Sequence, residues 1–161
     1  MRKLILLSCL FLMSCNFETP TSFSRAAKND PMIAVDGSKT TLNDLLERYK
    51  GNTVFIEFWA SWCADCIRGF PRIKSLQQKY DDVIFVFISV DEDYFSWKNG
   101  ILRHGLYGEH YNLPKGMNDG DLVDFVRLGY IPRYMVVDKE GDIALFKSTK
   151  AKDEALEQLL Y

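Results

Sequence analysis

The stretch from residue 54 to residue 66 constrains this chain most, because an apolar run with one acid leads directly into a Cys-x-x-Cys pair. The run is short, rich in β-branched and aromatic residues, and preceded by a turn at Gly51-Asn52, which predicts a buried strand. The apolar residues after it recur at near-helical spacing and predict a helix. Cys63 and Cys66 therefore lie where a strand meets the first turn of a helix. Unpaired N–H groups and the helix dipole favour a thiolate at that position.

The length of 161 residues fits one domain with short additions, and it allows a hydrophobic core without disulfide staples. The formal net charge of −2 gives no reason to expect a nucleic-acid partner. The sequence contains no internal repeat and no low-complexity tract.

The first residues have the pattern of a targeting segment rather than of a fold. Arg2-Lys3 precedes an apolar stretch that is too short to span a bilayer, and Leu12-Met13-Ser14-Cys15 resembles a bacterial lipobox. That resemblance implies a lipoprotein signal peptide over residues 1–14 and a lipid on Cys15. A plain secretory signal or an uncleaved membrane anchor are the alternatives. The polar residues that follow predict a flexible tether over residues 15–30, which leaves residues 31–161 as the folded domain.

Strands and helices alternate along residues 31–161. Apolar runs predict strands at 31–35, from 54, at 83–90, at 134–137 and at 143–146, the last two joined by a turn at 138–141. Helical spacing predicts helices at 42–49, from Cys66 to about Tyr80 with a kink at Pro71, at 94–103, at 119–128 and at 151–160, with a loop at 104–115. This order predicts an α/β sandwich with parallel central strands and an antiparallel terminal hairpin.

Several motifs in this order give the chain a resemblance to thioredoxin-fold proteins, and among them to the TlpA/ResA-like thiol–disulfide oxidoreductases of the bacterial envelope. The matching pieces are Phe58-Trp59-Ala60-Ser61-Trp62-Cys63-Ala64-Asp65-Cys66, Pro71, Ile88-Ser89-Val90-Asp91, Ile131-Pro132-Arg133 and Val137-Asp138-Lys139-Glu140-Gly141. The resemblance implies a thioredoxin-like three-layer α/β/α sandwich, with a central mixed sheet and a C-terminal β-hairpin. It covers nearly all of residues 31–161.

The resemblance also implies roles for matching residues. Cys63 is expected to be the exposed nucleophile and Cys66 the buried resolving thiol. Pro132 is expected to follow a cis bond and to face the disulfide, and Glu57 to be the buried acid behind it. The chain departs from the common pattern at Asp65, where a proline usually precedes the second cysteine, and at Gly69, where ResA-type members often carry a glutamate.

The chemistry of the remaining candidates follows from their surroundings. Glu57 is the one charge in an apolar strand, so burial is expected to raise its pKa toward a range useful for proton transfer with Cys66; the alternative is a polar rim. Ala64 and Asp65 between the cysteines are expected to tune the redox couple. A negative charge at Asp65 disfavours a thiolate at Cys63, which predicts a more reducing pair unless Asp65 points into solvent. Residues expected to form an apolar, substrate-binding rim around the sulfurs are Trp62, Tyr130, Ile131 and Pro132.

We expect no metal and no cofactor beyond the redox-active Cys63–Cys66 pair. A half zinc site needs a second ligand pair, and His104 and His110, predicted to be surface residues, lack zinc-motif spacing. Residues 91–93 are predicted to form a solvated loop. The expected partners are envelope proteins with thiols or disulfides, an upstream membrane electron donor, and the membrane itself through a lipid on Cys15. A non-enzymatic thioredoxin-like lipoprotein that binds or chaperones proteins is the main alternative, and a peroxidase the second.

Overall fold

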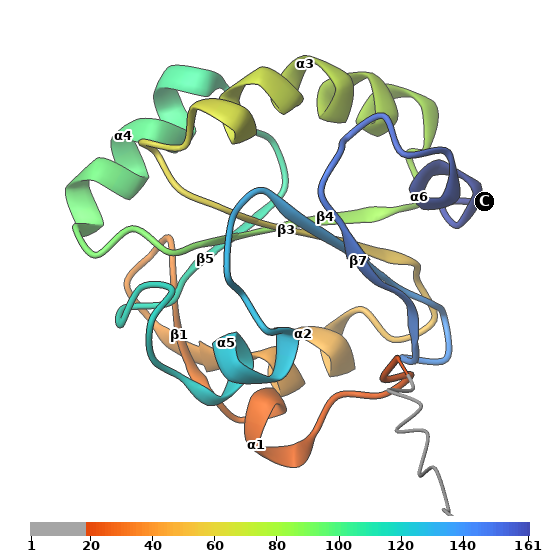
Figure 1. Ribbon diagram of the computed structural model, residues 1–161, viewed down its shortest axis with the longest axis horizontal. Coiled ribbons are helices and arrows are strands. Elements are labelled where there is room, and N and C mark those ends of the chain that lie inside the picture. Colours follow the sequence, from red (N-terminus) through yellow and green to blue (C-terminus); the bar gives the residue numbers. More distant parts are fainter. Residues whose placement is uncertain (1–18) are drawn as a thin grey trace, which may run out of the picture.

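The computed structural model describes residues 19–161. It contains a seven-stranded mixed sheet with helices on both faces (Figure 1). The strand order is β2-β1-β5-β4-β3-β6-β7. The strands are β1 (Pro31–Ala34), β2 (Lys39–Thr41), β3 (Val54–Trp59), β4 (Ile84–Ser89), β5 (Glu109–Asn112), β6 (Arg133–Val137) and β7 (Ile143–Ser148). The helices are α1 (Arg25–Lys28), α2 (Leu42–Arg48), α3 (Ala64–Lys79), α4 (Tyr94–His104), α5 (Asp121–Val126) and α6 (Glu154–Gln158).

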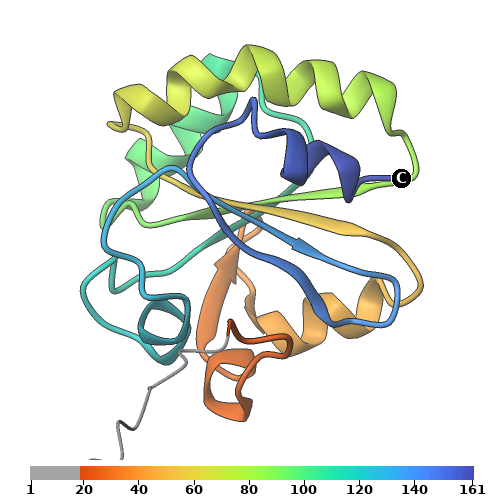
Figure 2. The same cartoon turned by 45° about the vertical axis from the view of Figure 1, so that its right-hand side comes forward.

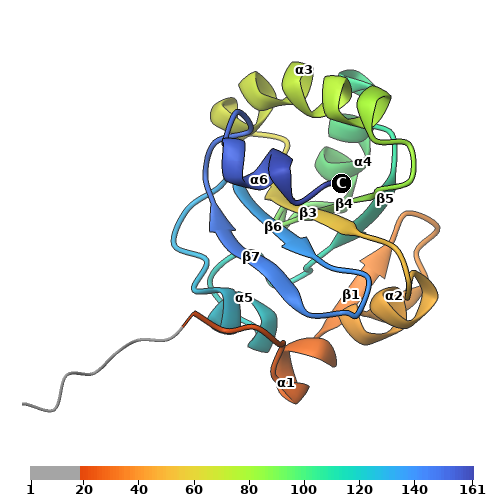
Figure 3. The same cartoon turned by 90° about the vertical axis from the view of Figure 1, so that its right-hand side faces the viewer.

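The helices divide between the two faces of the sheet. Helices α3, α4 and α6 cover one face, and α1, α2 and α5 lie on the other, as the three views agree (Figures 1, 2 and 3). Strands β3, β4 and β5 run parallel, whereas β6 and β7 add an antiparallel hairpin at one edge and β1 and β2 another at the opposite edge. The predicted three-layer α/β/α sandwich with a C-terminal hairpin is thereby confirmed.

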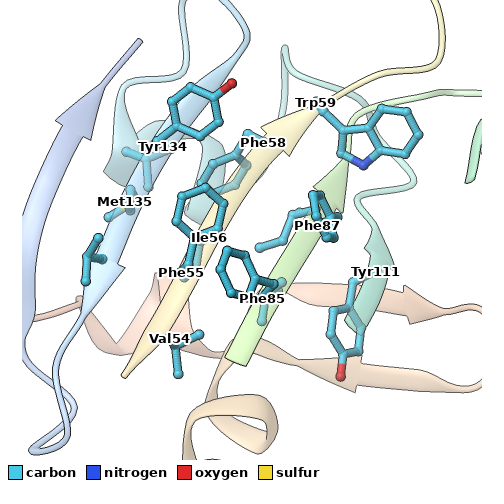
Figure 4. Packing of buried hydrophobic residues seen from close by; sticks show 14 of the residues in the cluster. Val54, Phe55, Ile56, Phe58, Trp59, Phe85, Phe87, Tyr111, Tyr134 and Met135 are labelled. Carbon is cyan, nitrogen blue, oxygen red and sulfur yellow. The ribbon is translucent and has the colours of Figure 1, made fainter. Parts of the chain in front are cut away.

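Strand β3 lies in the middle of the core. All six of its residues are buried, which explains why its sequence is a continuous apolar run rather than an alternating one. Figure 4 shows its aromatic residues against those of β4 and β6; the rings of Phe55 and Phe85 lie 5.0 Å apart, and those of Phe55 and Tyr134 5.7 Å apart. Burial on both faces fixes the register and direction of β3, and thus where the cysteines at its end are presented.

The segment from residue 104 to residue 115, predicted to be a loop, contains strand β5. Its residues, Glu109 to Asn112, have no β-branched member and only one apolar side chain, so neither periodicity nor propensity marks them as a strand. Pairing with β4 on one side and β1 on the other supplies the stabilisation that the local sequence lacks. The three-residue β2, which was not predicted, similarly depends on its antiparallel pairing with β1.

The predicted tether over residues 15–30 also needs correction. Residues 15–18 lie outside the described part of the chain, but residues 19–30 pack against the domain and include α1. Phe23 and Ala27 are buried, and the ring of Phe23 lies 5.4 Å from that of Phe125. The sequence did not predict this packing, because the segment is mostly polar and Phe23 and Ala27 are its only buried apolar side chains. The folded domain therefore begins before residue 31.

Candidate active site

Cys63 and Cys66 form a disulfide at the start of α3, with their Cα atoms 5.3 Å apart. Cys63 is the N-cap of the helix, and its Sγ accepts a hydrogen bond of 3.1 Å from the Cys66 N–H. A charged sulfur at this position would be stabilised by the same N–H group and by the helix dipole. Cys63 is more exposed to solvent than Cys66, as expected, but the difference is small: Cys63 keeps 5% of its surface exposed and Cys66 none.

The loop before Cys63 is held by a buried carboxylate that sequence reasoning assigned to a solvated loop. Asp91, 1% exposed, accepts hydrogen bonds from the Ser61 N–H at 2.9 Å, from the Ser61 Oγ at 2.7 Å and from the Ser89 Oγ at 2.7 Å. The prediction failed because three successive acids have the composition of a surface turn. Asp91 reaches Ser61 because Trp59 pairs with Ser89, which brings the carboxyl ends of β3 and β4 together, and no local pattern in the sequence shows this pairing.

The Ile131–Pro132 peptide bond is cis, as the resemblance implies, and it lies in the segment that enters β6. Trp62 and Tyr130 expose 63% and 46% of their surfaces, whereas Ile131 is half-buried and Pro132 buried. Two of the four residues predicted to bind the substrate thus expose aromatic rings, and such rings are common in protein-binding surfaces.

Ala64 and Asp65, the residues between the cysteines, are both exposed. The side chain of Asp65 keeps 63% of its surface in solvent and forms an ion pair with Arg68, one turn further along α3. Solvent and the guanidinium both weaken the effect of this carboxylate on Cys63, so the electrostatic argument for a reducing pair becomes weaker.

Glu57 is fully buried in β3, as the resemblance implies, and the alternative of a polar rim is excluded. Desolvation raises the pKa of its carboxyl well above the ordinary value, and the nearby Tyr134 hydroxyl opposes that shift. Neither carboxyl oxygen has a hydrogen bond of normal geometry within residues 19–161. A buried acid with a raised pKa holds a proton more readily than an exposed carboxylate, which suits it to accept a proton from a neighbouring group.

Tyr134 is a residue of this site that sequence reasoning missed. It pairs with Glu57 across β3 and β6, and burial together with the Glu57 charge raises the pKa of its hydroxyl. Gly69 of α3 leaves room for that hydroxyl: a Cβ at position 69 would lie 2.8 Å from the Tyr134 Oη. The sequence departs from the ResA-type pattern at Gly69, and the structure gives a reason: the Tyr134 hydroxyl occupies the space next to this glycine, between helix and sheet.

The two histidines contact residues other than the cysteines. His110, predicted to be a surface residue, is 8% exposed; its ring stacks on Phe87 at 5.1 Å and its Nε2 lies 3.1 Å from the Leu106 carbonyl oxygen. His104 is half-buried against Phe70. No group of three or more cysteine, histidine or acidic side chains able to hold a metal occurs in the described part of the chain.

The family model described as thioredoxin-like matches residues 51–143. Among curated proteins, the thiol–disulfide oxidoreductase ResA of Bacillus anthracis is 28% identical over 122 residues, which cover 74% of this chain and 65% of the relative. ResA of Bacillus thuringiensis subsp. konkukian is 25% identical over 146 residues, covering 89% of this chain and 79% of the relative. The chain thus spans just under two thirds of the length of the Bacillus anthracis relative.

Solved structures of similar fold include further thiol–disulfide oxidoreductases. A Bacteroides vulgatus protein assigned as a thiol–disulfide oxidoreductase superposes with a TM-score of 0.67 at 28% identity, covering 81% of this chain and 89% of that one. A thiol–disulfide oxidoreductase from Bacteroides fragilis has a TM-score of 0.69 at 20% identity, with coverages of 83% and 96%, and this second likeness concerns the fold alone.

Proposed function

Because this chain belongs to the thioredoxin-like family, we propose that it is a thiol–disulfide oxidoreductase that acts through Cys63 and Cys66. The observation that carries the proposal is the Cys63–Cys66 disulfide at the N-terminus of α3, in a domain whose sheet buries Glu57. The names of the ResA relatives support the same reaction class. A disulfide across so short a loop contributes little to stability, which leaves redox chemistry as its use.

The reaction proceeds by two exchanges when the reduced protein meets a client disulfide. The Cys63 thiolate attacks one client sulfur, forms a mixed disulfide and releases the other client sulfur as a thiolate. Cys66 then gives its proton to the Glu57 carboxylate and attacks the Cys63 sulfur, which displaces the second client thiolate. The client disulfide gains two electrons and the Cys63–Cys66 dithiol loses them, so a donor of two electrons must restore the protein.

We propose that reduction of client disulfides is the net direction, and that the negative charge at Asp65 adds a small contribution to it, because this charge disfavours the Cys63 thiolate and thereby the reduced form. Equilibration of the purified protein with glutathione buffers measures this preference directly. A reduction potential as oxidising as that of a disulfide-forming enzyme would contradict it. Asp65→Asn is expected to shift the potential only slightly, because the carboxylate is exposed and paired with Arg68.

The proposed location is the bacterial envelope, with the chain attached to the membrane by a lipid on Cys15 after removal of residues 1–14. Residues 1–18 lie outside the described part of the chain, so the support for this location is the lipobox-like sequence. None of the helices within residues 19–161 is long and apolar enough to cross a membrane. Cys15→Ser is expected to move the protein from the membrane fraction to the soluble fraction and to abolish labelling by a radioactive fatty acid.

Trapping tests the reaction and identifies clients. In Cys66→Ser the second exchange is blocked, so mixed disulfides on Cys63 are expected to accumulate and to be released by dithiothreitol for mass spectrometry. Cys63→Ser is the matched control, because it keeps one thiol but lacks the proposed nucleophile. A folded protein that neither reduces insulin nor traps any partner would instead support a non-enzymatic binding protein.

A further inference from the structure

A cavity of about 470 Å³ lies between the start of α3, which carries the disulfide, and the cis-proline. Its walls are the first two turns of α3, the segment from Tyr130 to Pro132, and residues 149–152 between β7 and α6. Asp65, which separates the two cysteines, and Pro132 both line it. The volume is within the usual range of ligand pockets, about 300–1,000 Å³, and is sufficient for a few side chains of a partner.

Cationic side chains gather around this cavity, although the chain as a whole has a net charge of −2. Four of its lining residues are basic and one is acidic: Arg68, Arg72, Lys150 and Lys152 against Asp65. A fifth cation lies near the lining residue Tyr130, because the Lys147 ammonium is 5.1 Å from the centre of the Tyr130 ring. A concave surface lined by one sign of charge attracts the opposite sign and raises its local concentration.

The structure neutralises only part of this charge. Arg72 pairs with Glu157, and Arg68 pairs with the exposed Asp65. Within residues 19–161, no carboxylate lies within salt-bridge distance of Lys150 or Lys152, and both lysines are exposed. A hydrogen bond from Ser148 and, to a smaller extent, the Lys150 charge lower the pKa of the Asp153 carboxyl, but Lys150 and Asp153 form no salt bridge. The wall of the cavity that faces α3 therefore keeps positive charge that no salt bridge neutralises.

We propose that this cavity binds an acidic segment of the client polypeptide, adjacent to the client cysteine that reacts with Cys63. The inference rests on the proposed oxidoreductase function and adds a substrate class to it. Carboxylates of the client would pair with Lys150 and Lys152 while the exposed rings of Trp62 and Tyr130 contact the residues near its cysteine. This arrangement orients the client disulfide toward the sulfurs of the protein and favours acidic clients over neutral or basic ones.

Two synthetic peptides with the same internal disulfide test the proposal, one flanked by Asp and Glu residues and the other by Asn and Gln at the same positions. At low salt, the reduced full-length protein is expected to reduce the acidic peptide with about 3- to 10-fold higher kcat/KM, the size expected of two exposed ion pairs. The preference is expected to fall as ionic strength rises beyond about 0.15 M, where the Debye length is about 8 Å.

Lys150→Gln/Lys152→Gln is expected to remove most of this preference and to leave the reduction of the amide-flanked peptide unchanged. Lys39→Gln/Lys139→Gln is the matched control, because it removes the same charge from exposed lysines outside the cavity lining. Equal rates for both peptides in the unmodified protein, or an equal loss of preference in both double variants, would overturn the proposal. Failure of the protein to reduce either peptide would instead count against the oxidoreductase function itself.

Discussion

At the scale of single residues, Glu57 is the buried acid of the candidate site. It is the one charged side chain in a fully buried strand, and its carboxyl lies near the Tyr134 hydroxyl under α3. Sequence alone could mark Glu57, because an acid within an apolar run is conspicuous. It could not mark Tyr134, because an aromatic residue in a strand is an ordinary core residue until the pairing with Glu57 and the gap at Gly69 are known.

Glu57→Gln is expected to make stability less dependent on pH. Burial raises the pKa of Glu57 in the folded protein, so the folded state binds more protons than the unfolded state above the unfolded pKa of about 4.3. The free energy of unfolding should therefore decrease as pH rises from that value through the folded pKa. Urea unfolding of the oxidised protein at pH 5 and pH 8 measures this decrease, and the variant should show a smaller one.

The control for Glu57→Gln is Glu140→Gln, which alters an exposed turn. It should reproduce the pH dependence of the unmodified protein. Identical pH dependence in all three proteins would show that Glu57 does not carry an altered pKa. In the reaction, Glu57→Gln should slow the second exchange and change its pH profile, since the proton acceptor for Cys66 is lost.

Tyr134→Phe is expected to raise the pKa of Glu57 further, because the hydroxyl that opposes the effect of burial is removed. A carbon-detected NMR titration of the Glu57 carboxyl measures the shift directly. Tyr94→Phe is the matched control: its hydroxyl donates to the Val35 carbonyl oxygen, away from Glu57. An unchanged titration in Tyr134→Phe would mean that the hydroxyl does not influence the carboxyl.

At the scale of elements, regular periodicity decided which parts of the fold were predictable. The strand before the cysteines, the helix after them and the terminal hairpin each have a clear apolar pattern, and the structure contains all three. Strand β5 has none, because its partners β1 and β4 are remote in sequence and supply its stabilisation. The ends of β3 and β4 show the same limit, since Asp91 acts on Ser61 only after the two strands pair.

Asp91→Asn is expected to loosen the loop that carries Cys63. The amide offers one acceptor oxygen where the carboxylate serves three donors, so we expect a loss of about 1.5–3 kcal/mol in the free energy of unfolding. Urea unfolding measures the loss, and faster hydrogen exchange at the Ser61 amide should accompany it. Asp93→Asn is the control: Asp93 caps α4, and asparagine caps a helix as well as aspartate does. Equal stability of the two variants would argue against an anchoring role.

At the scale of the whole molecule, residues 19–30 pack against the folded domain although their polar composition predicts a flexible tether. Residues 19–30 contribute the buried ring of Phe23, and the Thr21 carbonyl oxygen accepts a hydrogen bond of 2.6 Å from the Ile143 N–H at the start of β7. Helix α5 has no side-chain cap of its own, and the Asp30 Oδ2 instead accepts a hydrogen bond of 2.9 Å from the Leu122 N–H. The segment therefore holds the edge hairpin and α5 against the sheet.

A chain that starts at residue 31 is expected to be less stable than one that starts at residue 19. Burial of a large apolar side chain such as Phe23 contributes about 1.5–3 kcal/mol, and the loss of Asp30 leaves a buried N–H at Leu122 unpaired, which costs about 1–3 kcal/mol. Urea unfolding of the two chains measures the difference. Phe23→Ala and Asp30→Ala in the longer chain should each reproduce part of it, whereas Arg25→Gln, on the exposed side of α1, should not. Equal stability of the two chains would mean that residues 19–30 act only as a tether.

A marked loss of stability would instead mean that any lipid on Cys15 holds the folded domain within a few residues of the membrane.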